Sequence, residues 1–404
     1  MKQINGGVCA AQGFTAGGIH CGIRKNREKR DLGAILSAVD CTAAAVYTSN
    51  KVKAAPIYVT MEHLENGTAR AIICNSGNAN ACAPEGHENA KRMCRAAAAV
   101  LGVDEGDVVV ASTGVIGERL NVEAVETGAA ALAESLSGDG SNAMAEAIMT
   151  TDTRKKEIAV EVMIGGKAVH IGGVCKGSGM IHPNMGTMLS FITTDCAITS
   201  DMLHEALLKS TQKTYNRVSI DGDTSTNDMC CVLANGLAGN ELIEWQDENY
   251  EAFFEALNFV NTHLAREIAR DGEGATKLIS VTVKNSRNEE SAERLAKSVA
   301  ASSLVKAAMF GADANWGRVL CAMGYSKAPF RPEYVDVSFE SAEGSILVCE
   351  GGAGLVFDED LAKRILTKDE VTILIDVHEG AHEATAWGCD LTYDYVKING
   401  DYRT

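Results

Sequence analysis

The chain has 404 residues, of which 46% are hydrophobic and 23% charged, so it can bury a large core and two domains or closely packed lobes are expected. Its formal net charge of −17 excludes nucleic acid and anionic membrane surfaces as expected partners, because a net-acidic chain is repelled by phosphate groups.

The thirteen cysteines are scattered from Cys9 to Cys389, and none of them forms a C-x-x-C pair. An odd number without such spacing argues against zinc ribbons and against a disulfide framework. Reduced, mostly buried thiols in a cytoplasmic protein are the simplest interpretation. The sequence MKQINGGVCAAQGF at the start has no apolar core of a secretory signal, and no run of 18 apolar residues predicts a transmembrane helix.

In the first half of the chain, short apolar runs alternate with alanine-rich stretches of helical spacing. Two glycines, Gly165 and Gly166, predict the turn of a hairpin. The expected strands are 70–75, 107–111, 158–164 and 168–171, and the expected helices are 88–101 and 121–136.

The second half repeats this mixture of strands and helices. Helices are expected at 202–209 and 250–269, and strands at 277–283, 334–339, 345–348 and 371–377. No internal repeat, low-complexity tract or flexible linker is evident. The alternation predicts an α/β protein with mixed sheets.

Residues 176–195, KGSGMIHPNMGTMLSFITTD, contain a Gly186-Thr187 pair before a strand-like run. The hydroxyl of a threonine can attack the preceding carbonyl, and the small residue before it tolerates the strained backbone that this step requires. The α-amine freed in this way can then act as the base for its own hydroxyl. The alternative is a turn that opens a strand, with Thr187 bonded only to backbone.

A second segment of interest, STGVIGE at 112–118, follows the apolar strand of 107–111. A turn after a buried strand can present a threonine hydroxyl and a backbone N–H to the oxygen on which acyl transfer builds negative charge. The alternative is a helix N-cap, with Ser112 or Thr113 capping the helix that follows.

Two further patterns suggest metals. The sequence from His378 to His382 fits H-E-x-x-H, but it follows a strand-like run and contains Gly380, whereas zinc proteases need both histidines on one helix face. Asp221, Asp223 and Asp228 lack the bidentate Glu of an EF-hand loop, so they predict a turn that enters a buried strand and lines the site. No metal is expected.

Several long blocks together resemble the ornithine acetyltransferases, the ArgJ family of arginine biosynthesis, and the resemblance spans essentially the whole chain. The resemblance implies the mixed-sheet α/β/β/α sandwich of the self-cleaving ornithine acetyltransferase and DmpA-like group, with helices outside two stacked sheets. In chain order the blocks are NSGNANAC (75–82), STGVIGE (112–118), IMTTDT (148–153), the segment 176–195, DGDTSTND (221–228), REIARDGEGATK (266–277), GADANWGR (311–318) and the closing residues 387–404.

The family is known for self-cleavage before the threonine in this position, and the two products stay together, usually as an α2β2 assembly. The resemblance therefore implies an α chain of residues 1–186 and a β chain of residues 187–404. The bond is usually Ala-Thr in the family, whereas this chain has Gly186 before Thr187 and Ser190 in place of another common alanine. Glycine is sterically permissive, so cleavage is expected to survive.

The resemblance also implies the roles of individual residues. Thr187 is the nucleophile, and Thr113 and Gly114 form the oxyanion hole. Lys176 suits a carboxylate and Glu273 an ammonium group, whereas the alternative for both is a solvated loop charge. The residues implied in substrate binding are Thr150, Lys176, Thr187, Glu273, Asn399 and Thr404, the last of which requires an ordered C-terminus at the site.

The reaction implied is a ping-pong transfer of the acetyl group from N-acetylornithine to glutamate through acetyl-Thr187, with no cofactor. Family members are dedicated to acetylornithine or also accept acetyl-CoA, and the residues leave this donor open. The alternatives are a related self-cleaving aminopeptidase or amidase that uses water as the acceptor, and an acidic structural protein that retains the fold.

Overall fold

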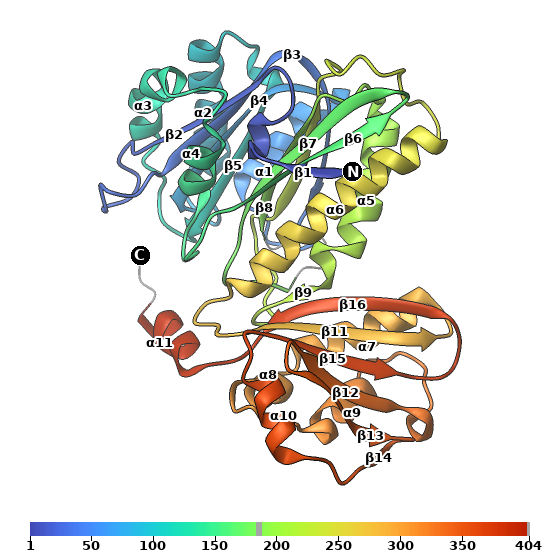
Figure 1. Cartoon of the computed structure of the whole chain (residues 1–404). Coiled ribbons are helices and arrows are strands. Elements are labelled where there is room, and N and C mark those ends of the chain that lie inside the picture. Colours follow the sequence, from blue (N-terminus) through green and yellow to red (C-terminus); the bar gives the residue numbers. More distant parts are fainter. Residues whose placement is uncertain (183–187, 402–404) are drawn as a thin grey trace.

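The computed structural model describes residues 1–182 and 188–401, which form two lobes, each built on a mixed β-sheet (Figure 1). Gly186, Thr187 and Thr404, three of the predicted site residues, lie outside the described residues. The strands and helices otherwise follow the predicted alternation closely. No helix among the described residues is long and apolar enough to cross a membrane.

The larger sheet has nine strands in the order β1-β6-β7-β8-β10-β3-β4-β5, with β2 paired to β3. Gly165 and Gly166 both have positive φ, as the predicted hairpin between β6 and β7 requires. The strands are β1 (Lys2–Ile4), β2 (Phe14–Ile19), β3 (Leu32–Tyr47), β4 (Thr68–Asn78), β5 (Val108–Val115), β6 (Lys156–Ile164), β7 (Lys167–Lys176), β8 (Leu189–Thr194) and β10 (Met229–Ala234).

The long strand β3 lets this sheet fold over on itself. Its first part pairs with β4 over Leu32–Leu36, and its last part pairs with β10 over Thr42–Tyr47. The register shifts between these parts, a feature that bends a strand. One core cluster therefore joins residues of β4 and β5, such as Ile72 and Val109, to Phe191 of β8. Two stacked layers of strands result.

Helices cover the two outer faces of this folded sheet. Met93 and Val125, from α2 and α3, pack on the outer face of β4 and β5. Phe253, Leu257 and Val260 lie at helical spacing on α6 and pack with α5 on the opposite face. The α/β/β/α arrangement expected from the resemblance is confirmed. The helices of this lobe are α1 (Ala55–His63), α2 (Gly86–Leu101), α3 (Val122–Glu134), α4 (Ser141–Ile148), α5 (Ser200–Lys213) and α6 (Glu248–Arg270).

The second lobe holds a seven-stranded sheet in the order β14-β13-β12-β15-β11-β16-β9, packed against helices α7 to α10 through its own apolar cluster (Figure 1). The sequence predicted several of its strands and the presence of two lobes, but not that these strands together form the second lobe. The strands are β9 (Val218–Ser219), β11 (Leu278–Ser286), β12 (Asp336–Ser341), β13 (Gly344–Glu350), β14 (Ala353–Gly354), β15 (Glu370–Asp376) and β16 (His382–Cys389). The helices are α7 (Glu289–Ala301), α8 (Ser303–Phe310), α9 (Trp316–Gly324) and α10 (Glu359–Leu366), and α11 (Tyr393–Asp401) follows β16.

Strand register brings several predicted site residues to the same region. Lys176, the last residue of β7, pairs with Leu189, and Leu189 in turn pairs with Met229 at the start of β10. On the adjoining layer, Gly77 of β4 pairs with Gly114 of β5. All thirteen cysteines are free, as the sequence predicts.

Candidate functional site

The turn that contains Thr113 and Gly114 is packed so closely that only glycine fits at its second position. Gly114 has φ +135°, and a Cβ there would lie 2.3 Å from the carbonyl carbon of Gly77. Thr113 lies inside β5 and is 8% exposed, and the N-cap of α3 is Asn121 rather than Ser112 or Thr113. The helix-cap alternative for this motif is therefore wrong.

Buried side chains fix the strand ends around this turn. The Ser112 hydroxyl donates to Asn75 Oδ1 at 2.6 Å. Asn227 Nδ2 donates to the carbonyl oxygens of Ala79 at 2.6 Å and Ser112 at 2.7 Å. Asn227 lies two residues before β10, so it ties β4 and β5 to the edge where β10 begins.

Lys176 lies at the end of β7 and is only 8% exposed, so the alternative of a solvated loop charge is wrong for it. Its positive charge acts on three buried neighbours, Cys74, Asp152 and Asp228. Lys176 therefore places a positive charge at the buried end of β7, where it is a suitable partner for a carboxylate.

Asp228 is a buried carboxyl beside the residue that follows Thr187. Its Oδ2 has no hydrogen-bond partner among the described residues. Burial raises the pKa of Asp228 well above its ordinary value, and the polar groups of Ser225, Thr48 and Met188 together with Lys176 oppose this only in part. Asp228 is consequently neutral over a wider pH range than an exposed carboxyl.

A buried ion cluster lies next to Lys176. Lys156 Nζ lies 2.7 Å from Asp152 Oδ1 and 2.6 Å from Asp271 Oδ2, and all three side chains are at most 2% exposed. Burial alone would raise the pKa of Asp152, but Lys156 and Lys176 lower it below its usual range. Burial alone would lower the pKa of Lys156, but the two carboxylates raise it. Both shifts favour the charged forms of Asp152 and Lys156.

This ion cluster, Asp152, Lys156 and Asp271, also holds the backbone of predicted substrate-binding segments. Asp152 accepts from the backbone N–H of Thr150 at 2.9 Å and of Gly177, next to Lys176, at 2.8 Å. The carbonyl oxygen of Asp271 accepts from the Ser178 hydroxyl at 2.7 Å. Hydrogen bonds and ion pairs of this cluster therefore hold together residues 150–156, residues 177–178 and Asp271.

Glu273 is the next predicted residue along this chain of contacts. Its N–H donates to the carbonyl of Ser178 at 2.8 Å, and its side chain is buried, which contradicts the solvated alternative. Asn399 Nδ2, from α11, donates to Glu273 Oε2 at 2.7 Å. A Cβ on Gly179 would lie 2.4 Å or less from this carboxylate, so the glycine leaves space for it. The C-terminal helix thus reaches Glu273 through Asn399, while the prediction for Thr404 lies outside the described residues.

The segment that leads to Gly186 is fixed at its start. Asp221 accepts from the backbone N–H of Met180 at 2.6 Å and of Ile181 at 2.8 Å. His182 Nδ1 lies 2.9 Å from Ser219 Oγ, and burial, together with the charge of Lys297, lowers the pKa of His182 to about 4. Asp221 therefore serves a turn, as the sequence predicts, rather than a metal loop.

The H-E-x-x-H pattern does not form a metal site. His378 lies in the connection after β15 and bonds Asp336 Oδ2 at 2.7 Å, while Glu379 pairs with Arg287 and Arg331. His382 starts β16, so the two histidines do not share a helix. Within residues 1–182 and 188–401, no group of three or more His, Cys, Asp or Glu side chains is arranged to hold a metal ion.

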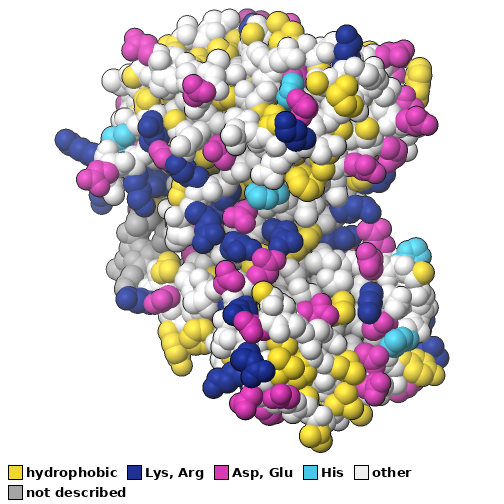
Figure 2. Space-filling model, viewed as in Figure 1, with side chains coloured by type: hydrophobic (Ala, Val, Ile, Leu, Met, Phe, Trp, Pro, Cys, Tyr) yellow, Lys and Arg dark blue, Asp and Glu magenta, His cyan; other side chains and the backbone are white. Residues whose placement is uncertain are grey.

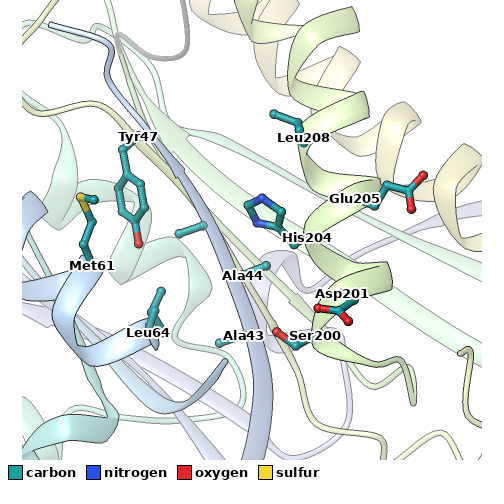
Figure 3. A pocket seen from close by; sticks show the side chains of 11 residues that line it. Ala43, Ala44, Tyr47, Met61, Leu64, Ser200, Asp201, His204, Glu205 and Leu208 are labelled. Atoms are coloured by element: carbon teal, nitrogen blue, oxygen red, sulfur yellow. The ribbon is translucent and has the colours of Figure 1, made fainter. Parts of the chain in front are cut away.

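A groove of about 450 Å³ lies elsewhere, between α1, β3 and α5 (Figure 3). Ala43, Ala44 and Ala45 of β3 line it, and Tyr47 and His204 project from opposite sides of it. It contains none of the predicted site residues, so the chemistry is not placed there.

Comparison with known proteins shows the family of this chain. The model of the ArgJ family matches residues 15–404. The chain belongs to the ArgJ family. Among its ArgJ relatives, the arginine biosynthesis bifunctional protein ArgJ of Symbiobacterium thermophilum is 52% identical over all of both chains, and that of Bacillus subtilis is 46% identical over all of this chain and 98% of the relative. A crystal structure of ArgJ from Bacillus halodurans is 46% identical, with a TM-score of 0.51, and covers 54% of this chain and 100% of its own.

Some residues of the candidate site were not identified from the sequence. Asp152, Lys156 and Asp271 were missed as a cluster, and Asn227 was missed as a brace between strands. Most of them lie inside blocks that the sequence singled out, IMTTDT, REIARDGEGATK and DGDTSTND. The position of a residue in one of these blocks was therefore a sign that it could belong to the site. Only the fold shows which residues from different blocks contact one another.

Proposed function

We propose that this ArgJ protein transfers an acetyl group from N-acetylornithine to glutamate, giving ornithine and N-acetylglutamate in arginine biosynthesis. The observation that carries the proposal is the bonded framework next to position 187. Lys176 pairs with Leu189, and Glu273 donates to the carbonyl of Ser178, two residues after Lys176. Asn227 joins the carbonyl of Ser112, beside Thr113 and Gly114, to the edge where β10 begins. The family membership and the names of the relatives support the same activity.

The proposed catalyst is generated by self-cleavage between Gly186 and Thr187. The Thr187 hydroxyl attacks the carbonyl carbon of Gly186, the peptide C–N bond breaks, and water opens the resulting ester. An N-terminal threonine results, whose α-amine can serve as the base for its own hydroxyl. The Bacillus halodurans structure supports this division, because its whole chain corresponds to 54% of this one, the share that residues 187–404 make up.

Acetyl transfer then proceeds in two steps, acetylation of Thr187 and transfer of the acetyl group to glutamate. Thr187 Oγ attacks the acetyl carbonyl while the α-amine takes its proton, and the C–N bond of acetylornithine breaks as that proton passes to the leaving amine. The amine of glutamate next attacks the acetyl ester, and the hydroxyl of Thr187 is restored. The backbone N–H of Gly114 and the Thr113 hydroxyl are the proposed donors to the oxyanion, and such donors typically contribute about 10²–10³ each in rate.

Substrate recognition follows from the charges of the site. We assign the substrate carboxylate to Lys176 and the ornithine ammonium to Glu273, which Asn399 orients from α11 at 2.7 Å. Thr150 and the C-terminal Thr404 complete the proposed set. The α and β chains are proposed to assemble as α2β2, and no cofactor takes part in these steps.

Acceptor dependence tests this proposal against the hydrolase alternative. Purified protein is incubated with N-acetylornithine, with and without glutamate, and ornithine and N-acetylglutamate are measured. We expect both products only with glutamate, and neither with the Thr187→Ala variant. Equal consumption of acetylornithine without glutamate would favour a hydrolase, and full turnover by the variant would remove Thr187 from the chemistry.

A further inference from the structure

One carboxyl of this acidic chain is buried beside the predicted cleavage point. Figure 2 shows Asp and Glu side chains on the surface, where water solvates them, but Asp228 is only 2% exposed. It precedes β10, and the parallel pairing of Met229 with Leu189 places it across from Met188, the residue before β8. Asp228 therefore lies next to the residue that follows Thr187 in the chain.

The backbone of Asp228 is fixed on both sides. Its carbonyl oxygen accepts from the backbone N–H of Thr48, the residue after β3, at 3.0 Å. The N–H of the following residue, Met229, donates to the carbonyl of Met188 at 3.0 Å. Asp228 is thereby held between two strands of the larger sheet, and close packing keeps its buried side chain at the start of β8.

The side chain of Asp228 leaves one oxygen unused. Within the described part of the chain, the charged side chain that acts on it is Lys176 from β7, while β3, β8 and residue 225 contribute neutral groups. Its Oδ2 has no hydrogen-bond partner within residues 1–182 and 188–401. A protonated carboxyl is a donor as well as an acceptor, and buried polar groups are almost always paired, so a partner for this oxygen is expected.

Covalent geometry limits the distance from this carboxyl to the scissile peptide. The backbone N–H of Met188 acts on the carboxyl of Asp228 and opposes the rise of its pKa, so the two groups are close. The nitrogen of Thr187 is separated from that of Met188 by three bonds, and hence by at most about 3.7 Å. The nitrogen that must leave Gly186 in self-cleavage therefore lies a short distance from a buried acid.

We propose that Asp228 is the acid that protonates the nitrogen of Thr187 as the peptide bond to Gly186 breaks. This inference deepens the proposed function and rests on it. The α-amine that serves as a base in acetyl transfer does not exist before the cut, so the first reaction needs another group to move protons. An amide nitrogen leaves readily only when it takes up a proton, and the step therefore needs an acid that is still protonated near neutral pH.

Burial supplies this property. An exposed aspartic acid is ionised near neutral pH, whereas burial raises the pKa of Asp228 well above its ordinary value. The positive charge of Lys176 lies near enough to stabilise the carboxylate once the proton has left. Asp228 can thus hold a proton before the cut and release it during the cut.

The step balances without any further reactant. Thr187 Oγ bonds to the carbonyl carbon of Gly186, the C–N bond breaks, and the proton of Asp228 moves to the released nitrogen. The proton lost by the hydroxyl returns to the carboxylate of Asp228, so the acid is regenerated. Water then opens the ester as proposed above.

Cell-free synthesis followed by a chase tests this role, because it times the cut from completion of the chain. Denaturing gels follow the fraction cut, and intact mass identifies the cut after Gly186. Asp228→Asn keeps the size and polarity of the side chain but has no acidic proton. We expect it to cut about 10²-fold more slowly than the wild-type chain or slower still, since general acid–base catalysis typically contributes about 10²–10⁴ in rate.

The matched control is Asp195→Asn, which replaces a carboxyl that is 0% exposed just after the far end of β8. This variant is expected to cut at the wild-type rate. Circular dichroism of both variants shows whether they fold. Slow cutting by the control as well would overturn the inference, because loss of any buried carboxyl on this strand would then suffice.

The pH dependence supplies a readout that a purely structural role would not move. From about pH 6 to about pH 9, cutting of the wild-type chain is expected to slow as the acid loses its proton, and Asp228→Asn is expected to lack this decrease. A wild-type rate that does not fall with pH would overturn the inference, whether or not the variant folds.

Two further outcomes separate this inference from the proposed function. Equal rates in the wild-type chain and Asp228→Asn would overturn the inference alone, and would mean that the carboxyl only fills space or holds a buried water. An uncut wild-type chain would contradict the proposed self-cleavage and the inference together.

Discussion

At the residue scale, Gly114 shows how backbone packing can dictate one amino acid. Its φ of +135° disfavours any side chain, and the carbonyl carbon of Gly77 occupies the position that a Cβ would need. The motif STGVIGE indicated a functional turn, but sequence spacing does not show that two strands meet at these glycines. The sequence thus predicted a functional turn at these residues, but not the close approach of the two strands that requires glycine there.

Replacing Gly114 with alanine is expected to lower kcat by about 10²-fold or more, because the turn must shift and the oxyanion donors with it. Gly117→Ala is a matched control, since Gly117 also has positive φ but nothing lies within 4 Å of its Cβ position. Steady-state kinetics of both variants measure kcat, and we expect the large decrease only in Gly114→Ala. Equal loss in the two would attribute the effect to backbone strain rather than to the close contact.

The raised pKa of Asp228 leads to a prediction about how the stability of the protein depends on pH. Because burial raises its folded-state pKa above the unfolded value, its contribution to stability is lost as the pH rises toward the folded pKa. An amide carries no such cost, so Asp228→Asn is expected to unfold at a higher temperature than the wild-type protein near pH 8. This difference in unfolding temperature between the variant and the wild-type protein is expected to become smaller as the pH falls to 5, because Asp228 is then more fully protonated in the unfolded state as well. Thermal unfolding at both pH values measures it, and a gain that is independent of pH would contradict the raised pKa.

At the scale of elements, the ion cluster of Asp152, Lys156 and Asp271 joins segments that carry Thr150, Lys176 and Glu273. Charged residues at these positions look ordinary in the sequence, because their partners are as far as 115 residues away. The short strands and long helices were predictable from local apolar periodicity. The pairing of β3 with both layers, which stacks them, depends on long-range contacts that periodicity does not encode.

Lys156→Met leaves two buried carboxylates without their shared cation, and breaking a buried pair in this way costs roughly 3–5 kcal/mol. We expect a lower free energy of unfolding and a raised KM for acetylornithine. The loss of stability is expected to diminish as the pH falls, because the unpaired carboxylates then bind protons. Denaturant unfolding and steady-state kinetics measure the two effects.

A control for this variant is Asp195→Asn, at the far end of β8. Asp195 is 0% exposed and accepts from the backbone N–H of His170 at 2.7 Å, so its replacement also disturbs a buried carboxylate. It is expected to lower stability without raising KM. A raised KM in both variants would mean that the cluster acts only through global stability.

At the scale of the whole molecule, the larger sheet contains strands from both sides of the predicted cleavage point. β7 pairs with β8 from Ile171↔Thr194 to Lys176↔Leu189, and β8 pairs with β10, which pairs with β3. The expected α and β chains therefore share one sheet and one core. They are predicted to co-elute in gel filtration without denaturant and to separate only when the sheet unfolds; separation of native fragments would contradict this.

The most direct test of the account is an intact-mass measurement on the purified protein after brief incubation with N-acetylornithine and no glutamate. The account predicts two chains, one ending at Gly186 and one beginning at Thr187, with a single added acetyl group on the second chain only. Addition of glutamate is predicted to remove that group. An uncut chain with full acetyltransferase activity, or an acetyl group on the first chain, would contradict the assignment of Thr187 as the nucleophile.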